Sequence, residues 1–485
     1  MGRHGSANGF FYTRARNLRT RPKSIFLVSP AHWTGPGSRA LHPPMKSLTA
    51  LALSFGLACS PSLSSCRSST SAAISRNLPQ RVNLTTRPWF PPIIPQESFS
   101  CAQHAGLYYT LGTEIARSRG TTTQSPALRL SPSHAYLLLA DSTSRRSHLI
   151  DGWILAADSG VPLESDLPRP SQTLMSGFHK YRRALLNRAQ SWQVLPLSDS
   201  PSLNKALQLL ADQHPLATEF PIQGAKILPF PAGTPSGCRA IVSSWGQSGP
   251  GHAMVYAGFD QSIGRDCNGD GRITSDIDIT GDGLVTLADR EQGAFLAVNP
   301  WGRSWGDRGM AWVLFRDHAI TRWPWSQYVA TVQPSPPKPP RTMLKLSLHC
   351  ADRSSLQIAA GSHGRPHLWQ PLLFRSAPAP KRPGNNVWEA FARLHHHGPH
   401  ISKGPLSSAN GQPAELGFLL PDNFPTTNWS LSLSPSQGSR LSGNLHAASI
   451  VHLSNDGSII REFPLPNLPA PLPPLGHSWL SSSSH

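Results

Sequence analysis

The stretch that decides the fold reads Gln96-Glu97-Ser98-Phe99-Ser100-Cys101-Ala102-Gln103-His104. Three prolines precede it, and proline both fixes its own φ and discourages helix in the residue before it, so the chain should arrive extended. After Cys101, apolar residues recur at helical spacing as far as Ile115, and Gly120 offers a stop. The pattern predicts a helix that begins at Cys101.

This position favours a reactive thiol at Cys101. Unpaired backbone N–H groups and the positive end of a helix dipole stabilise an anion at a helix start. We therefore expect the thiol to be pushed toward thiolate, which is the form that attacks carbonyls. The alternative is a buried structural cysteine, which is the commoner fate of a free thiol.

Two later segments support the catalytic interpretation. In Gly251–Phe259, His252 leads into an apolar run of the kind found in strands. In Phe295–Gly309, another apolar run ends at Asn299, and Trp301 and Trp305 follow among three glycines at fixed offsets. A cysteine nucleophile needs a base, and the base needs a third group to hold its ring.

The order Cys, His, Asn, with Asn-x-Trp-Gly-x-x-Trp-Gly-x-x-Gly around the last, resembles the papain family of cysteine peptidases from about Gln96 to about Phe315. The resemblance implies that Cys101 is the nucleophile and that His252 is the general base. It implies that Asn299 fixes the ring of that base, while Trp301 shields their hydrogen bond. Gln96 would join the Cys101 backbone N–H in the oxyanion hole.

The chain departs from papain around the nucleophile. Gln96 lies five residues before Cys101, where papain has six, and Ala102 follows the nucleophile in place of a tryptophan. The Ser-Cys-Ala-Gln sequence is closer to a divergent, mostly bacterial branch of the family that carries a calcium-type insert. Asp151-Gly152-Trp153 also recurs in that branch, and we interpret it as packing and positioning.

An insert at residues 264–291, between His252 and Asn299, has the pattern of two calcium loops. In the second loop, oxygen-bearing side chains occupy positions 1, 3, 5, 9 and 12, and a glycine stands at position 6 for the sharp turn. Its predicted ligands are Asp278, Thr280, Asp282, Thr286 and Asp289. The first loop offers Asp266, Asn268 and Asp270, and Asp276 or Asp278 would close it. We expect structural Ca²⁺ and no cofactor for catalysis; the alternative is a solvated acidic turn.

Residues 1–44, which we call the leader, account for part of the basic charge. The net charge is +18, and seven basic residues lie in residues 1–44, which contain no acid. No recognised binding motif accompanies this charge, so it supports a nucleic-acid partner only weakly, and we expect none. Residues 45–66 have the shape of a secretory signal peptide, so we expect a secreted or cell-surface protein. The apolar run is too short to span a bilayer, but Gly56–Cys59 resembles a lipoprotein box, which leaves a lipid anchor at Cys59 as an alternative.

At 485 residues, the chain is long enough for two or three domains. Helical patterns precede residue 215 and strand patterns follow it, so we expect an α+β fold in which a helical lobe faces a β-barrel-like lobe. Alternation beyond residue 342 predicts an all-β, sandwich-like domain. The expected order is a basic leader at 1–44, a signal segment at 45–66, a linker at 67–90, the peptidase domain at 91–332, a proline-rich linker at 333–341, the β domain at 342–463 and a disordered tail at 464–485.

The function that these patterns predict is a secreted cysteine endopeptidase acting on proteins or peptides. Three alternatives remain open. One is a related fold kept as a non-catalytic binding protein. Another is a different thiol acyl-transfer enzyme, such as a transglutaminase-like one, which would want Asp at position 299. The third is a calcium-stabilised adhesion protein in which the β domain does the work.

Overall fold

The computed structural model describes residues 77–140, 144–230, 237–246, 251–321, 324–362, 365–371, 374, 401–408, 410–436, 438–476 and 478–482. All of these residues belong to one compact unit, Arg67–His485. The predicted leader, the signal segment and the candidate lipid site Cys59 lie outside the described residues.

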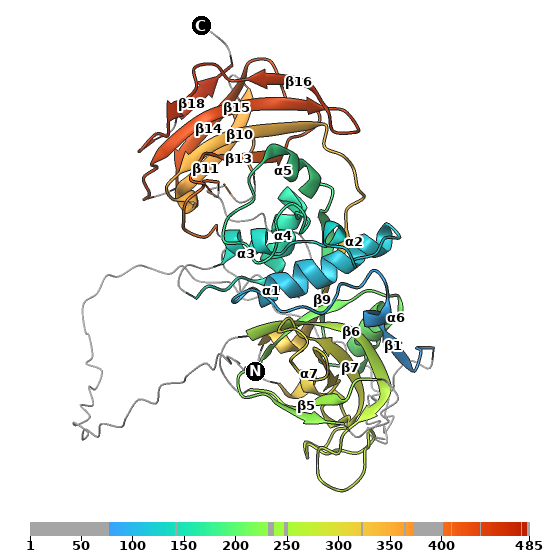
Figure 1. Ribbon diagram of the computed structural model, residues 1–485. Helices are drawn as coiled ribbons and strands as arrows, with labels where there is room; N and C mark the ends of the chain where they lie inside the picture. Colours follow the sequence, from blue (N-terminus) through green and yellow to red (C-terminus); the bar gives the residue numbers. More distant parts are fainter. Residues whose placement is uncertain are drawn as a thin grey trace, which may run out of the picture. The chain divides into compact units, whose positions relative to one another are not determined.

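The helices of the described residues lie mainly in the first half of the unit, and those labelled α1, α3 and α4 lie near one another (Figure 1). The predicted helix start at Cys101 is confirmed, and helix α6 buries one face formed by Leu203, Ala206, Leu207 and Leu210. The helical segments are α1 (Cys101–Gln103), η2 (His104–Leu111), α2 (Gly112–Ser118), α3 (Ser133–Leu139), α4 (Leu149–Ser159), α5 (Phe178–Ala184), α6 (Ser200–Ala211) and α7 (Asp317–Ile320). Short 3-10 turns are η1 (Leu84–Thr86), η3 (Pro126–Leu128), η4 (Leu287–Asp289), η5 (Pro324–Gln327) and η6 (Arg353–Ser355).

The segment η2 winds as a π-helix, which the sequence pattern does not predict. Its wider turns are supported by two side chains. The Thr110 hydroxyl donates to the Ala105 carbonyl at 2.7 Å, and the Trp153 indole N–H of α4 donates to the Gly106 carbonyl at 2.8 Å. A π-helical stretch occurs preferentially at functional sites, and here it follows directly on Cys101.

The first sheet has the order β2-β9-β3-β6-β7-β8-β5-β4, with β1 paired to β6. All its pairings are antiparallel except β5 with β8. The strands are β1 (Arg81–Asn83), β2 (Ala189–Pro196), β3 (Leu216–Pro221), β4 (Lys226–Pro229), β5 (Ala240–Ser244), β6 (Gly251–Gly264), β7 (Gln292–Val298), β8 (Met310–Leu314) and β9 (Tyr328–Pro334). Helices and antiparallel strands in separate parts of the chain confirm the α+β class.

The C-terminal residues form two further antiparallel sheets, ordered β13-β10-β15-β16, with β17 beside β15, and β12-β11-β14-β18. The strands are β10 (Thr342–Cys350), β11 (Leu356–Ser362), β12 (Arg365–Trp369), β13 (Ala414–Leu419), β14 (Trp429–Pro435), β15 (Gly443–Leu453), β16 (Ile459–Pro464), β17 (Ala470–Pro471) and β18 (Ser478–Ser481).

The predicted linkers and tail are more ordered than the sequence indicates. Within the predicted linker 67–90, β1 pairs with β6 and Leu84 is buried. At the predicted proline-rich linker, β9 continues to Pro334. The predicted disordered tail is wrong for residues 470–471 and 478–481, because β17 and β18 pair there with β15 and β14. Short strands rich in serine and proline do not stand out from loop composition, and tertiary pairing decides them.

Candidate active site

Cys101 begins α1 and is only partly buried. Burial raises the pKa of its thiol to about 11, and the nearby backbone N–H of Ala253 opposes this shift without cancelling it. Loss of hydration therefore acts against the thiolate that the helix start was expected to favour.

His252 and Asn299 lie together, as predicted. The ring Nε2 of His252 and the Oδ1 of Asn299 are 2.8 Å apart, and both residues are buried. The Trp301 backbone N–H also donates to Oδ1, at 2.9 Å. Because that N–H can only donate, the atom it meets is the amide oxygen, and Nε2 of His252 must carry the proton. The other ring nitrogen, Nδ1, is then left with its lone pair, as a base requires.

The Trp301 ring packs beside this hydrogen bond. Its centroid lies 4.6 Å from that of His252, and the side chain remains 42% exposed. The indole thus covers the imidazole on the side that would otherwise meet water. Burial lowers the pKa of His252 to about 4, and the hydrogen bond to Asn299 acts against that shift. Burial therefore favours the neutral form of both the thiol and the imidazole.

The thiol and the imidazole come from different parts of the fold. Helix α1 packs against β6, which carries His252. The Cys101 thiol lies near the backbone N–H of Ala253, the residue that follows His252. Among the described residues, no hydrogen bond joins the thiol to the ring. In sites without substrate, such catalytic hydrogen bonds are often long and form fully only when the substrate is bound.

Two backbone contacts bring the loops of Cys101 and Asn299 together. The Gln96 N–H donates to the Pro300 carbonyl at 2.6 Å. Gly302 has φ +82°, and a Cβ built there would lie 2.7 Å from the backbone nitrogen of Pro95. The extended entry to Cys101 therefore runs directly against the Asn-Pro-Trp-Gly turn, and only glycine fits at residue 302.

Gln96, predicted for the oxyanion hole, lies in this same loop. Its Nε2 donates to the Ser98 carbonyl at 2.7 Å, and its buried Oε1 has no hydrogen-bond partner among the described residues. One side-chain N–H is thus engaged within the loop, so the amide would have to turn for both of its hydrogens to face a substrate.

A buried network that the sequence did not reveal holds the loop before Cys101. The Arg169 guanidinium donates to Nε2 of His104 at 3.0 Å, which makes Nδ1 the protonated nitrogen, and Nδ1 lies 3.0 Å from the Ser100 hydroxyl. Arg169 also pairs with Glu164 and lies 3.9 Å from Glu97. Arg169 lies far along the chain from Cys101 and belongs to no motif, so no sequence signal marks it.

The predicted positioning role of Asp151-Gly152-Trp153 fits the packing of α4. A Cβ at Gly152 would lie 2.0 Å from Oε1 of Gln103. That Gln103 side chain, two residues after Cys101, donates to the Ser147 hydroxyl and to the His148 carbonyl. Because Gly152 has no side chain, the Gln103 side chain has the space to connect α1 to the start of α4.

The insert leaves the end of β6 and returns at β7, where Gly264 pairs with Gln292. In each half of the insert, a loop aspartate accepts two backbone N–H groups. Asp266 accepts from Gly269 and Gly271, and Asp278 accepts from Gly281 and Gly283. The two loops therefore share one backbone design, as the sequence repeat predicts.

Each loop is closed by a buried carboxylate. Asp289 accepts from the N–H of Ile279, the residue after Asp278, and from Thr286. Glu291 accepts from the N–H of Cys267, the residue after Asp266, and from Thr274. Glu291 thus does for the first loop what Asp289 does for the second. Sequence spacing missed Glu291 because it lies beyond the second loop and not at the end of the first.

The structure does not show a formed metal site. Over the described ranges, there is no group of three or more His, Cys, Asp or Glu side chains placed to hold an ion. Of the candidates for closing the first loop, Asp276 makes no hydrogen bond in the described part of the insert and Asp278 belongs to the second loop. The donor chemistry still fits calcium, because every predicted ligand offers hard oxygen.

The four cysteines within the described ranges, Cys101, Cys238, Cys267 and Cys350, are unpaired. The same part of the chain contains no helix long and apolar enough to cross a membrane.

No protein-family model matches the chain, and no curated protein matches it. Among solved structures, it is similar to xylellain, a cysteine protease from Xylella fastidiosa (16% identity, 55% of this chain, 91% of that chain, TM-score 0.35). It is similar to procathepsin L 3 of Tenebrio molitor (15% identity, 54% of this chain, 73% of that chain, TM-score 0.36). It is also similar to the Carica candamarcensis cysteine protease CMS1MS2 in complex with E-64 (15% identity, 53% of this chain, 99% of that chain, TM-score 0.34). Similarity of this size does not assign the chain to a family.

Proposed function

We propose that this chain is a papain-like cysteine endopeptidase that hydrolyses peptide bonds through Cys101, His252 and Asn299. The observation that carries the proposal is the hydrogen bond of 2.8 Å between His252 and Asn299. It leaves Nδ1 of His252 as a base, on the strand that packs against the helix of Cys101. The sequence order and the Asn-Pro-Trp-Gly turn point to the same chemistry.

The proposed reaction is acyl transfer. Sγ of Cys101 attacks the peptide carbonyl carbon, and the thiol proton passes to Nδ1 of His252. The tetrahedral oxyanion meets the Cys101 backbone N–H and the amide of Gln96 once that amide turns. His252 then returns the proton to the leaving amine, and a water deprotonated by His252 cleaves the thioester.

The finer architecture is part of this proposal. We take the helices that follow Cys101 and the sheet that carries His252 as the two lobes of a papain-like fold. We take the two C-terminal antiparallel sheets as a sandwich-like domain. Antiparallel sheets with one apolar face bury it by packing on another layer, and β10 and β14 both bury apolar side chains.

We also propose that the insert binds structural calcium. Asp278, Thr280, Asp282, Thr286 and Asp289 would hold an ion in the second loop. Asp266, Asn268 and Asp270 would hold one in the first loop, with Glu291 in the closing role. Bound calcium would neutralise these carboxylates and brace the connection from β6 to β7. Export of the chain, directed by residues 45–66, belongs to the proposal as well.

Peptide hydrolysis by the purified full chain tests the proposal. Wild type, Cys101→Ser and Cys267→Ser are compared on a denatured protein substrate, with products identified by mass spectrometry. Cleavage at peptide bonds that is lost only in Cys101→Ser supports the proposal. Cleavage that survives Cys101→Ser, or its absence in a wild-type chain with a free thiol, contradicts it and favours a non-catalytic binding protein.

A further inference from the structure

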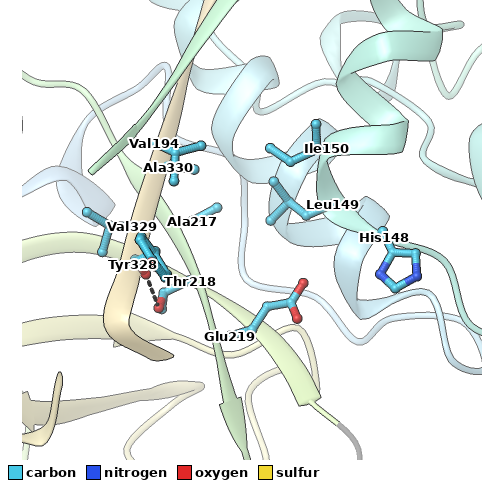
Figure 2. A pocket seen from close by; sticks show the side chains of 10 residues that line it. All are labelled: His148, Leu149, Ile150, Val194, Ala217, Thr218, Glu219, Tyr328, Val329 and Ala330. Atoms are coloured by element: carbon cyan, nitrogen blue, oxygen red, sulfur yellow. Dashed lines mark hydrogen bonds between the residues drawn. The ribbon is translucent and has the colours of Figure 1, made fainter. Parts of the chain in front are cut away.

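A small pocket adjoins the candidate active site, and its walls come from the start of α4 and from three strands, β2 (Val194), β3 and β9 (Figure 2). The start of α4 contributes Leu149 and Ile150, β3 contributes Ala217 to Glu219, and β9 contributes Tyr328 to Ala330. Most of these side chains are aliphatic. A pocket with such walls favours an aliphatic stretch of a ligand.

Glu219 is the acidic residue of this pocket. Its backbone pairs with Ala253, the residue directly after His252. Its charge acts on the Cys101 thiol, and it is among the causes of the raised pKa of that thiol. The pocket therefore lies beside the bond that the thiol would attack, where it would meet a side chain close to the cleavage point.

The Glu219 carboxylate has no hydrogen bond or ion pair among the described residues. In Figure 2 it extends from β3 toward the side of the pocket where His148 lies, and no dashed line reaches it. The labelled neighbour Thr218 instead donates to the Tyr328 carbonyl at 3.1 Å. A partly buried carboxylate without a partner is costly, and a cation brought by a ligand would supply that partner.

We propose that Glu219 is a specificity-determining residue that selects a lysine or arginine side chain at one substrate position near the scissile bond. The aliphatic walls accommodate the methylene stem, and the carboxylate pairs with the ammonium or guanidinium group. This inference rests on the proposed peptidase function and deepens it.

The selection depends on pH. Burial raises the pKa of Glu219 to about 7, so the carboxylate gains its charge as the pH rises through that value. Other titratable or charged groups near it are Cys101, His148, Tyr328 and Arg146. Comparing two substrates that differ only in the cationic group cancels the contribution of those groups to the chemical step. The preference for the cation should then increase from pH 6 to pH 8.

The test uses fluorogenic peptides from a positional library, followed by matched peptides with lysine or norleucine at the selected position. Norleucine keeps the aliphatic stem and lacks the charge. For wild type, we expect kcat/KM to favour lysine roughly 10-fold or more at pH 8. In Glu219→Gln, the lysine-to-norleucine ratio of kcat/KM should approach one and lose its pH dependence. Glu462→Gln, on β16, is the matched control and should keep the wild-type ratio.

The outcomes separate this inference from the proposed function. Hydrolysis without a cationic preference at any position, or a lysine-to-norleucine ratio unchanged in Glu219→Gln, overturns the role of Glu219 and leaves the peptidase intact. Absence of hydrolysis together with an unreactive Cys101 overturns both. An equal loss of kcat/KM for both peptides in Glu219→Gln, at unchanged Tm, also overturns it and indicates a general effect on the thiol.

Discussion

Asn299 holds the ring of His252 in one tautomer, because its amide oxygen is fixed by a second donor, the Trp301 N–H. We expect Asn299→Ala to lower kcat/KM by roughly 10- to 1,000-fold, since the ring loses its orientation and its proton is no longer confined to Nε2. Peptide hydrolysis measures this. The loss should appear in kcat with little change in KM, and Tm should show whether the fold survives. Full activity in Asn299→Ala would contradict the role of Asn299 in orienting the His252 ring.

Trp301 should matter through shielding. Trp301→Ala opens the hydrogen bond between His252 and Asn299 to water, and we expect kcat/KM to fall by about 10-fold. Trp301→Phe keeps an aromatic ring beside the imidazole and should retain most of the activity. Equal activity of the two variants would show that the ring does not protect the site.

Gly302 couples the two loops of the site. Gly302→Ala introduces a Cβ against the Pro95 backbone, and positive φ adds strain of about 1–3 kcal/mol. Gly224→Ala is a matched control, because Gly224 also has φ +82° but no atom within 4 Å of the position that a Cβ would take. Both variants should lose stability, measured by urea unfolding. Only Gly302→Ala should also lose activity, and equal activity in the two would contradict the coupling.

Buried histidines should make the protein acid-labile. Burial lowers the pKa of His104 to about 3, and of His134 and His318 to about 4. An unfolded histidine has a pKa near 6.5, so below that pH the unfolded chain binds more protons than the folded one. Stability is therefore full above about pH 6.5 and falls as the pH drops toward 4.

Urea unfolding at several pH values measures this dependence. His134→Phe should flatten the fall between pH 6.5 and 4, because the phenyl ring does not titrate, while exposed His446→Gln should leave it unchanged. A wild-type free energy of unfolding that stays constant from pH 7 to pH 4 would contradict the interpretation that these histidines are buried in their neutral form.

Calcium should stabilise the insert. We expect added Ca²⁺ to raise Tm of the chelator-treated full chain and Mg²⁺ to do so much less, since the loops offer many oxygens in flexible geometry. Asp278→Ala and Glu291→Gln should each weaken the response, and Asp276→Asn should not. A Tm indifferent to calcium would show that backbone N–H groups alone satisfy these carboxylates.

The sequence predicted the elements of the site better than its electrostatics. Apolar runs marked β6 and β7, because burial in the sheet selects apolar residues along each strand. Cys101, His252 and Asn299 stood out through order and flanking glycines and tryptophans. The desolvation that raises the pKa of the Cys101 thiol could not be predicted, because it depends on which strands cover α1.

Contacts that form only in the tertiary structure could also not be predicted from the spacing of residues in the sequence. Arg169 reaches His104 across the fold, and Glu291 closes a loop that begins 25 residues earlier at Asp266. Glu219 lies in an ordinary strand pattern, and only the pairing of β3 with β6 brings it beside His252.

The most direct test of the central claim is covalent labelling of the full chain by a peptidyl epoxide, with the adduct located by mass spectrometry. The account predicts one adduct, on Cys101, which His252→Ala prevents and which leaves the half-buried Cys267 unmodified. Labelling of Cys267 in place of Cys101, or labelling of Cys101 that is unaffected by His252→Ala, would contradict it.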